Sequence, residues 1–383
     1  MKPMLIALRS ILCLAIMVAV LEICARLDDT LSYGAPFWGA YNDESLYTTD
    51  AIGKWGKPNA RYERWQLNSL GYRGPELRTG TIRIVCFGAS ETFGLYEAPD
   101  EEYPRQLERD LNRLANGPHF QVVNAAYAGE TLTAAIRHVP RVVSQVYPSY
   151  ALIYPSLAEY ISIATRSSRP IPSNSAATWA DWVGRLRIVS RLHNLLKRAL
   201  PRAVQTKLQE LQIKRDSANI PVIERVPQEN VERFREDLTA LIGALRNYEV
   251  EPVLVTHATA FGPNLSPGDR PLLTAWRKFY PMLKEDGFID MEHRMNDVIR
   301  ETAVREGVLL IDAADEIPPR PEYFADFVHF TTAGAGVMAA KLADGLRPIV
   351  FFRLQRETSV TSADRSPTSK GGASDVQPAV GNR

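Results

Sequence analysis

Short runs of apolar residues alternate with amphipathic segments along most of this chain. Apolar runs long enough for a buried strand are separated by stretches whose apolar positions have helical spacing. Repeated strand and helix segments of this length predict a parallel sheet covered by helices on both faces. The predicted strands are 82–87, 119–124, 150–154, 251–256 and 307–312, and the predicted helices are about 103–115, 131–144, 228–247 and 291–305, with a final helix after residue 330.

Four stretches flank or interrupt this alternation. Residues 1–26 are predicted to form an N-terminal membrane helix, and residues 27–80 a leader rich in aromatic residues, glycine and proline. Residues from about 162 to 226 contain no evident core strand and are predicted to be a helical insertion or lid. Residues 351–383 are expected to be a disordered tail, because they are rich in Ser, Thr, Gly and charge. The main domain therefore spans residues 81–350.

The first 26 residues are apolar enough to form a membrane anchor. The stretch from Met4 to Cys24 is about 21 residues long, close to the length that crosses a bilayer, although Arg9 interrupts it. A signal-peptidase site is poorly formed, because Ile23 stands where a small residue is needed before Ala25. Lys2 and Arg9 favour a cytoplasmic N-terminus. We therefore expect an uncleaved, single-pass anchor with the main domain outside the cytoplasm, in the periplasm or extracellular space.

Composition narrows the function classes. The formal net charge is +1, with 45 basic and 44 acidic residues, so the overall balance does not suggest a nucleic-acid partner. Of three cysteines, Cys13 and Cys24 lie in the expected anchor and Cys86 lies in the first strand, which leaves no disulfide framework for the domain. No spacing of cysteine and histidine is typical of a zinc site, and no glycine-rich loop ends in Lys-Ser or Lys-Thr. The sequence implies no metal and no cofactor.

The expected insertion is basic. Residues 183–214 are predicted to be mainly helical with a break at Pro201. Two interpretations remain open: the segment binds anionic lipid or an anionic polymer, or it is a solvated outer face that covers the domain. The basic residues of the segment are Arg185, Arg187, Arg191, Lys197, Arg198, Arg202, Lys207, Lys214 and Arg215.

Two polar motifs stand where chemistry is expected in such a fold. Ser90 follows the strand at 82–87 on a turn of small residues, and the ends of strands are where an open α/β sheet places its reactive groups. Asp326 and His329 are three residues apart in a predicted loop before the last helix, so the carboxylate can orient the imidazole. A serine, a base and an acid that orients the base form a nucleophilic triad. We therefore predict Ser90 as nucleophile, His329 as base and Asp326 as the orienting acid.

Each motif also has a plainer interpretation. A serine after a strand is commonly a helix N-cap, because its hydroxyl satisfies backbone N–H groups. An Asp-x-x-His sequence is commonly a surface turn. His257 follows the strand at 251–256, and it is a candidate either for the pocket or for a capped position in a loop.

Three sequence blocks resemble the SGNH family of GDSL-type esterases and acyltransferases, particularly its membrane-anchored branch. The resemblance runs from roughly Asn68 to Leu346, apart from the insertion. The family's Gly-Asp-Ser block is matched by residues 88–90, with alanine in the middle. Its Asn-Ala-x-x-x-Gly-x-Thr block is matched by residues 124–131, and its Asp-x-x-His block by Asp326 and His329.

The third of the family's four blocks is altered. Members usually carry Gly-x-Asn-Asp or Gly-x-Asn-Glu after the third strand, and the asparagine amide donates a hydrogen bond to the oxyanion. Here Ser156, Ala158 and Glu159 occupy those positions, and a methyl group cannot donate. The resemblance then implies the backbone N–H groups of Ser90 and Gly129 as oxyanion donors. Ser156, Ala158 and Glu159 are candidate pocket residues, together with His257.

The resemblance implies a flavodoxin-like, three-layer α/β/α fold with a central parallel sheet. It also implies a serine esterase or O-acyltransferase that forms an acyl-enzyme on Ser90. Its expected substrates are acyl esters, foremost acetyl esters, of an extracytoplasmic carbohydrate. The alternative is a weak or inactive protein of this fold that binds or assembles a polysaccharide. An α/β-hydrolase is a third interpretation, but Thr92 replaces the last glycine of Gly-x-Ser-x-Gly. The expected partners are an acylated carbohydrate or polymer and the membrane.

Overall fold

A computed structural model describes most of the chain, and the chain divides into two compact units, residues 1–345 and 346–383. The sheet and every site discussed below belong to the first unit. The described residues are 2–39, 41–161, 186–199, 202–216, 221–262 and 268–363.

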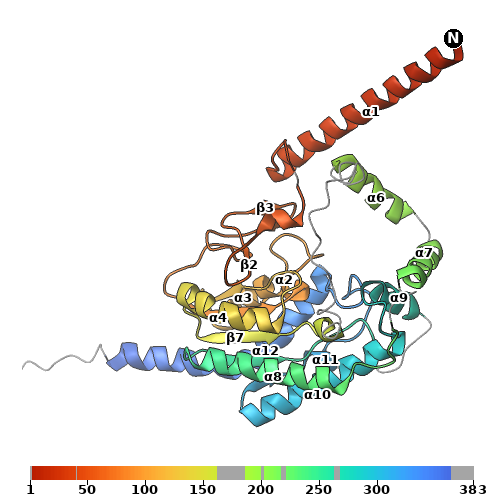
Figure 1. Cartoon of the computed structure of the whole chain (residues 1–383). Coiled ribbons are helices and arrows are strands. Elements are labelled where there is room, and N and C mark those ends of the chain that lie inside the picture. The colour runs from red at the N-terminus through yellow and green to blue at the C-terminus, as the bar shows by residue number, and fades with distance from the viewer. Residues whose placement is uncertain are drawn as a thin grey trace, which may run out of the picture. The chain divides into compact units, whose positions relative to one another are not determined.

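Five parallel strands form the central sheet of the first unit (Figure 1). They are β5 (Ile82–Gly88), β6 (Phe120–Asn124), β7 (Tyr150–Tyr154), β8 (Glu251–Val255) and β9 (Leu309–Ile311). Their spatial order is β6-β5-β7-β8-β9, so the strand that comes first in sequence lies between the second and the third. This 2-1-3-4-5 order is that of flavodoxin-like folds, and it confirms the predicted fold class. The five predicted strands are present, with ends that differ by no more than two residues.

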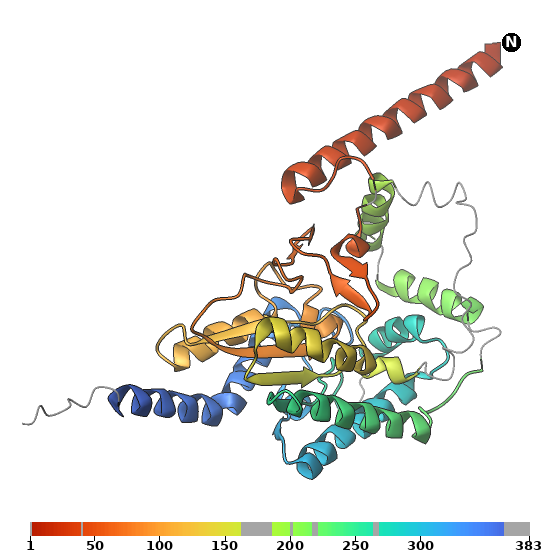
Figure 2. The same ribbon diagram turned by 60° about the vertical axis from the view of Figure 1, so that its left-hand side comes forward.

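Helices cover the sheet, as Figures 1 and 2 show from two sides. The helices of the main domain are α3 (Tyr103–Leu114), α4 (Leu132–Val146), α8 (Gln228–Arg246), α9 (Arg270–Phe279), α10 (Glu285–Glu306) and α12 (Thr332–Ala363), with the short α2 (Ser90–Phe93), η2 (Ala158–Ile161) and α11 (Ala313–Glu316). Helix α8 packs against both α4 and α10, whereas α3 packs against β6.

Alternate residues of each strand point into different layers, as the pleat of a strand requires. In β5, Val85 and Phe87 belong to the large apolar cluster that includes residues of α4, α8 and α10. Ile84 and Cys86 are equally buried but lie outside that cluster. The strands are continuous apolar runs in the sequence because both faces of the sheet are buried.

Helix α10 begins earlier than the predicted start near residue 291, and α9 was not predicted. Glu285 and Asp286 lie in the first turn of α10, where carboxylates favour the positive end of the helix dipole. Pro271 lies at the start of α9, a position where its fixed φ and missing N–H cost nothing. Both start signals were present in the sequence, but the stretch has no long apolar period that would have drawn attention to it.

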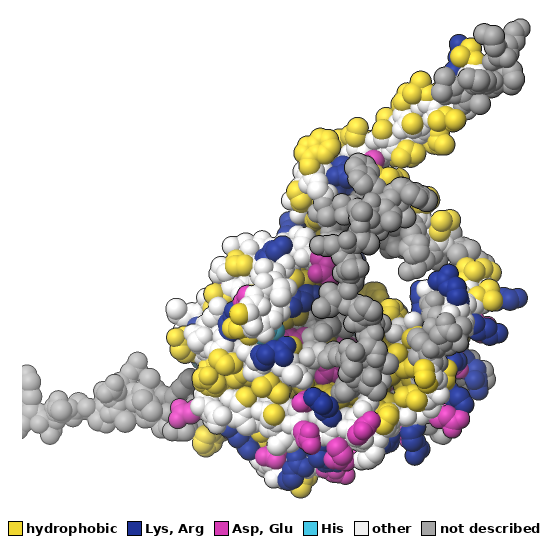
Figure 3. All heavy atoms as spheres, viewed as in Figure 1, with side chains coloured by type: hydrophobic (Ala, Val, Ile, Leu, Met, Phe, Trp, Pro, Cys, Tyr) yellow, Lys and Arg dark blue, Asp and Glu magenta, His cyan; other side chains and the backbone are white. Residues whose placement is uncertain are grey.

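The N-terminal helix α1 spans Lys2–Tyr33 and thus continues beyond the predicted boundary at residue 26. Within its segment Arg9–Tyr33, a window of 18 residues reaches a mean hydropathy of 2.3, so the helix is long and apolar enough to cross a membrane. Figure 3 shows hydrophobic side chains along this helix and mixed acidic and basic side chains near α8 and α10. After α1 the predicted leader forms η1 (Asp43–Leu46) and two short hairpins, β1 (Tyr47–Thr49) with β2 (Lys54–Gly56) and β3 (Arg61–Tyr62) with β4 (Trp65–Gln66).

The predicted insertion contains α6 (Arg187–Ala199) and α7 (Arg202–Asp216), while residues 162–185, including Arg185, lie outside the described residues. Two of its basic side chains have acidic partners at the end of α1. Arg187 lies 3.2 Å from Asp29, and Arg191 lies 2.7 Å from Asp28 and 2.5 Å from Asp29. These two arginines are therefore neutralised by the protein itself.

The expected tail starts later than residue 351. Helix α12 continues through Ala363, because residues 349–363 contain no glycine or proline and include several good helix formers. Residues 364–383 lie outside the described residues.

Candidate active site

The turn after β5 places Ser90 at the carboxyl edge of the sheet. Gly88 ends the strand, and a Cβ atom on it would lie 2.0 Å from Thr92 Oγ1 and 2.9 Å from the Tyr154 carbonyl oxygen. Only glycine fits such a close approach between the strand and the first turn of α2. The small residue at this position therefore lets the chain turn sharply and leaves Ser90 at the mouth of the sheet.

The structure brings Ser90, His329 and Asp326 into one hydrogen-bonded chain. Ser90 Oγ lies 2.9 Å from His329 Nε2, and His329 Nδ1 lies 2.8 Å from Asp326 Oδ2. Asp326 Oδ1 accepts hydrogen bonds from the backbone N–H groups of Val328, at 3.0 Å, and His329, at 2.9 Å. Because the turn holds its own carboxylate, the orientation of the imidazole is set locally.

The pKa values of the acid and the base move apart. Burial alone would raise the pKa of Asp326, but its hydrogen bonds to His329 and to the backbone lower it below its usual value. Burial alone would lower the pKa of His329, but the Asp326 hydrogen bond and the charge of Glu91 raise it above its usual value. The arrangement therefore favours an ionised acid beside an imidazole that readily accepts a proton.

Two backbone N–H groups near Ser90 have the character of oxyanion donors. Among the described residues, neither Ser90 N nor Gly129 N donates to another protein group. Gly129 has φ +77°, a left-handed conformation that favours glycine. Asn124 joins the two loops, since its Nδ2 donates to the Thr92 carbonyl at 2.8 Å and its Oδ1 accepts from Ala126 N–H at 3.2 Å.

Ser90 faces a cavity of about 400 Å³. Ser156, Ala158 and His257, three of the candidate pocket residues, line it. Glu159 does not line it, and its carboxylate instead accepts the Leu132 N–H at 3.1 Å, which ties η2 to the start of α4. The full lining is Ser90, Glu91, Leu95, Tyr96, Ala128, Gly129, Ser156, Leu157, Ala158, His257, Trp276, Phe279, Tyr280, Asp326, Phe327, Val328 and His329.

One wall of this cavity is aromatic. Trp276 of α9 stacks on Phe327 with ring centroids 5.0 Å apart, and Phe279 and Tyr280 extend the same wall. Across the mouth, Tyr96 lies edge-on to His329 at 5.5 Å. The sequence did not identify this wall, because its residues come from an unpredicted helix and from positions between Asp326 and His329.

Two buried groups lie beside the triad: Glu91, which was not identified from the sequence, and His257, which was predicted only as a candidate pocket residue. Glu91 follows the nucleophile directly, and its Oε2 lies 3.1 Å from Ser90 Oγ. His257 is 2% exposed and pairs through Nδ1 with Glu292 at 3.0 Å. A signal for Glu91 was its position, because a carboxylate next to a nucleophilic serine at a strand end is placed where charge affects the reaction.

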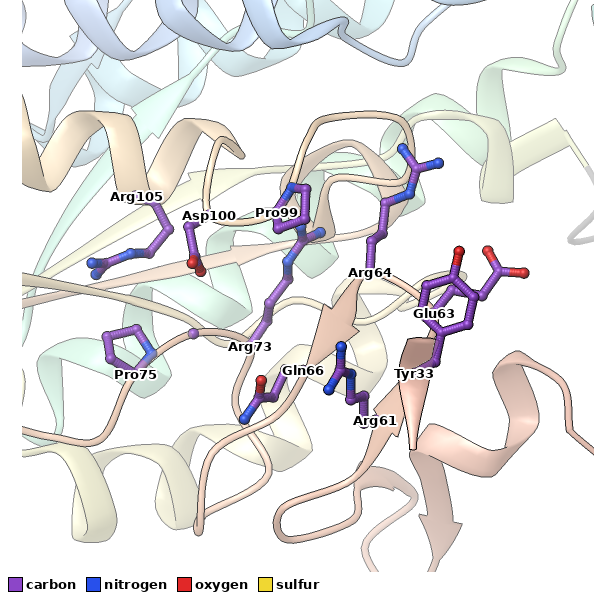
Figure 4. Close-up of a pocket in the computed structure, with 11 residues that line it drawn as sticks. Tyr33, Arg61, Glu63, Arg64, Gln66, Arg73, Pro75, Pro99, Asp100 and Arg105 are labelled. Atoms are coloured by element: carbon purple, nitrogen blue, oxygen red, sulfur yellow. The ribbon is translucent and has the colours of Figure 1, made fainter. Parts of the chain in front are cut away.

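A second, larger cavity of about 600 Å³ lies away from the triad (Figure 4). Four arginines line it, but Arg73 pairs with Glu102 at 3.3 Å and Arg105 pairs with Glu108 at 2.9 Å. Arg64 donates to the Tyr96 carbonyl at 3.1 Å. Its described lining contains no serine, histidine or cysteine, so it has no counterpart of the Ser90–His329 pair. Within the described residues, no group of three or more His, Cys, Asp or Glu side chains could hold a metal ion.

Comparisons with known proteins found similarities among solved structures. Neither a family model nor a curated protein matches the chain. Among solved structures, it is similar to a lipase/acylhydrolase from Enterococcus faecalis, with 16% identity, 70% of this chain and 96% of that chain covered, and a TM-score of 0.41. It is also similar to the acetyl xylan esterase AlAXEase, with 14% identity, coverage of 69% and 100%, and a TM-score of 0.41.

A third similar structure is a catalytic mutant of Axe2, an acetylxylan esterase from Geobacillus stearothermophilus. It shares 13% identity, with 70% of this chain and 96% of that chain covered and a TM-score of 0.41. Identities this low do not transfer an activity from one protein to another. The reaction of this chain must therefore be inferred from the geometry around Ser90.

Proposed function

We propose that this protein is a membrane-tethered serine esterase or O-acyltransferase that forms an acyl-enzyme on Ser90. The observation that carries the proposal is the hydrogen-bonded chain Ser90–His329–Asp326, which opens into the cavity beside it. A hydroxyl, an imidazole and a carboxylate linked in this order are the parts of a nucleophilic acyl-transfer site.

The chemistry follows from the order of these groups. As Ser90 Oγ bonds to the carbonyl carbon of an ester, its proton passes to His329 Nε2 and the carbonyl π electrons move onto the oxygen. Asp326 stabilises the imidazolium through Nδ1. When the tetrahedral intermediate collapses, the bond to the leaving alkoxide breaks and His329 gives it the proton. Water or a sugar hydroxyl then attacks the acyl-enzyme by the same steps.

The oxyanion site limits the expected rate. The backbone N–H groups of Ser90 and Gly129 are two donors, and Ala158 offers no side-chain donor. Loss of one such donor costs on the order of 100- to 1000-fold in turnover. We therefore expect a slow or specialised enzyme, with the hydroxyl of Ser156 in the cavity lining as a candidate replacement donor.

The substrate class rests on the resemblance and on the shape of the site. We propose acyl esters, and acetyl esters first among them, of an extracytoplasmic carbohydrate. The aromatic wall formed by Trp276 and Phe327 suits the apolar face of a sugar ring as well as an acyl chain. Helix α1 would tether the domain to the membrane, and Lys2 and Arg9 would keep its N-terminus in the cytoplasm.

The test compares the full-length protein with Ser90→Ala, using hydrolysis of a small aryl acetate and labelling by a fluorophosphonate. We expect the variant to lose label and at least about 1000-fold in hydrolysis. Ser144→Ala is a matched control, because Ser144 is exposed on α4 and bonds only to the Arg141 carbonyl at 2.9 Å. Equal hydrolysis by parent and Ser90→Ala would refute the mechanism.

The absence of a side-chain amide at Ala158 favours one second candidate, a binding or assembly protein for an acylated polymer that has lost catalysis. The same experiment separates the two. A folded parent protein that neither takes up the fluorophosphonate nor hydrolyses the aryl acetate would support the binding function.

A further inference from the structure

The Ser90 hydroxyl has two hydrogen-bond acceptors within reach. His329 Nε2 lies 2.9 Å from Oγ, and Glu91 Oε2 lies 3.1 Å from the same atom. A hydroxyl carries one proton, so it can donate to only one of them at a time. The triad described above uses His329 and leaves the contact with Glu91 without a function.

Glu91 is buried, with 4% of its surface exposed, and a buried carboxylate needs partners. Its second oxygen, Oε1, lies 3.5 Å from both His257 Nε2 and Ser156 Oγ. Glu91 is thus the group through which the nucleophile contacts a second histidine, at the floor of the same cavity.

His257 is held rigidly. Its Nδ1 lies 3.0 Å from Glu292 Oε2, and its ring stacks on Tyr154 with centroids 5.2 Å apart. The Asn296 side chain bonds both backbone groups of His257. It accepts from the N–H group at 2.7 Å and donates to the carbonyl oxygen at 2.9 Å. Since the Nδ1–H group of the protonated ring donates to Glu292, its Nε2–H group points toward Glu91.

The charges of this group are stable over the working pH range. Burial alone would lower the pKa of His257, but Glu292 and Glu91 raise it to about 10. Burial alone would raise the pKa of Glu91, but the hydrogen bond from His257 and the charges of His329 and His257 lower it to about 2. Near neutral pH, Glu91 is therefore a carboxylate and His257 is its cationic partner.

We propose that Glu91 is a further catalytic residue of this site: a carboxylate 3.1 Å from the nucleophilic oxygen of Ser90 that stabilises the positive charge formed on His329, with His257 and Glu292 holding it in place. The proposal deepens the esterase function and rests on it. During attack, the Ser90 proton moves to His329 Nε2, and the imidazolium then faces two carboxylates, Asp326 at Nδ1 and Glu91 across the nucleophile.

The same carboxylate constrains the substrate. A negative charge beside Ser90 repels the developing oxyanion, so the carbonyl oxygen must turn toward the N–H groups of Ser90 and Gly129. It also repels a carboxylate or phosphate next to the scissile ester. The described lining contains no lysine or arginine, and its cationic His257 already faces two carboxylates, Glu91 and Glu292. The geometry therefore favours esters of uncharged groups.

Other titratable groups face His329, and each affects its titration. Asp326 bonds to Nδ1, and the Tyr96 ring lies 5.5 Å away. Glu97 is buried on the loop after α2, and burial raises its pKa to about 7. Glu97 therefore loses its proton near neutral pH, so the effect of Glu91 has to be measured as a difference between variants.

The first experiment measures the pH dependence of fluorophosphonate labelling of Ser90 in the full-length protein and in Glu91→Gln. The general base must be neutral, so the rate falls as the pH drops through the pKa of His329. In Glu91→Gln we expect this acid limb to move to lower pH by about one pH unit, and the plateau rate to fall about tenfold. Glu91→Asp keeps the charge, and its limb should remain near that of the parent.

Glu301→Gln is the matched control, because Glu301 is an exposed carboxylate on α10 whose partner is Arg235 at 2.8 Å. It should change neither the limb nor the plateau. If the acid limb of the labelling rate lies at the same pH in Glu91→Gln as in the parent, Glu91 does not stabilise charge on His329. The proposal is then overturned, whatever the plateau labelling rate.

The second measurement needs neither a folded variant nor an active enzyme. NMR of the parent protein with ¹³C-labelled histidine rings should show the His329 resonance titrating above the ordinary pH of 6.5, and the His257 resonance unchanged between pH 5 and 8. A His329 titration at or below 6.5, or a His257 titration within that interval, contradicts the proposal. An unlabelled Ser90 with both titrations as expected would instead refute the esterase function and leave the charge arrangement intact.

Discussion

Two histidine–carboxylate pairs lie beside the same nucleophile, and they differ in exposure. In the pair His329–Asp326 the side chains are 14% and 23% exposed, whereas in the pair His257–Glu292 they are 2% and 5% exposed. The nitrogen–oxygen distances are similar, 2.8 Å and 3.0 Å. The hydrogen bond itself is therefore not what distinguishes them.

The difference is the number of carboxylates hydrogen-bonded to each ring and the exposure of the ring. His257 lies between Glu91 and Glu292, so burial cannot expel its proton and its pKa rises to about 10. His329 has one bonded carboxylate and opens toward the substrate, so it can gain and lose a proton during turnover. A histidine paired with a carboxylate therefore serves as a base when its other ring nitrogen faces the substrate. It serves as a fixed charge when both ring nitrogens face carboxylates.

Breaking the partly exposed His329–Asp326 pair should change activity the most. Asp326→Asn should lower kcat/KM for an aryl acetate by about 10⁴-fold, because an amide holds the imidazole in the wrong tautomer and no longer stabilises its charge. The stability of the protein should change little, since the pair is partly exposed. Steady-state kinetics and a urea unfolding curve measure the two quantities. A variant with near-parental activity would show that His329 is not the base.

Breaking the buried His257–Glu292 pair should have the next largest effect, on stability. Glu292→Gln should lower the free energy of unfolding by about 3 kcal/mol, because it removes one partner of a buried charge. Urea denaturation measures the loss, and Glu301→Gln serves as the exposed control. An unfolding midpoint equal to that of the parent would mean that the His257 charge is not held by Glu292.

The smallest effect is a pH dependence. The folded-state pKa of His257 is raised, to about 10 from 6.5, so the stability it contributes is complete below pH 6.5 and is lost as the pH rises toward 10. Between pH 7 and 9 we expect the free energy of unfolding to fall by about 2 kcal/mol. Glu97, whose pKa is about 7, acts mainly below this interval. In Glu292→Gln the slope should be shallower, and an equal slope would assign the effect to other groups.

The alternation of apolar and amphipathic segments was sufficient to predict the sheet. The predicted strand at 150–154 coincides with β7, because a strand buried on both faces is a continuous apolar run bounded by turn residues. Ser90 and the Asp326–His329 turn were predicted from short motifs, since each depends mainly on its own few residues. Helix α9 was missed because its burial depends on aromatic partners that are distant in sequence.

The amino-acid sequence alone was enough to predict most strands and helices, and the reactive residues at their ends. The contacts between these residues depend on the tertiary fold, because Ser90 and His329 are 239 residues apart and Glu91 and His257 are 166 residues apart. Periodicity reports which face of a segment is buried, but it does not report which side chains touch across the edge of a sheet. The charges on His257 and Glu91 arise from those contacts, and so they became visible only in the folded chain.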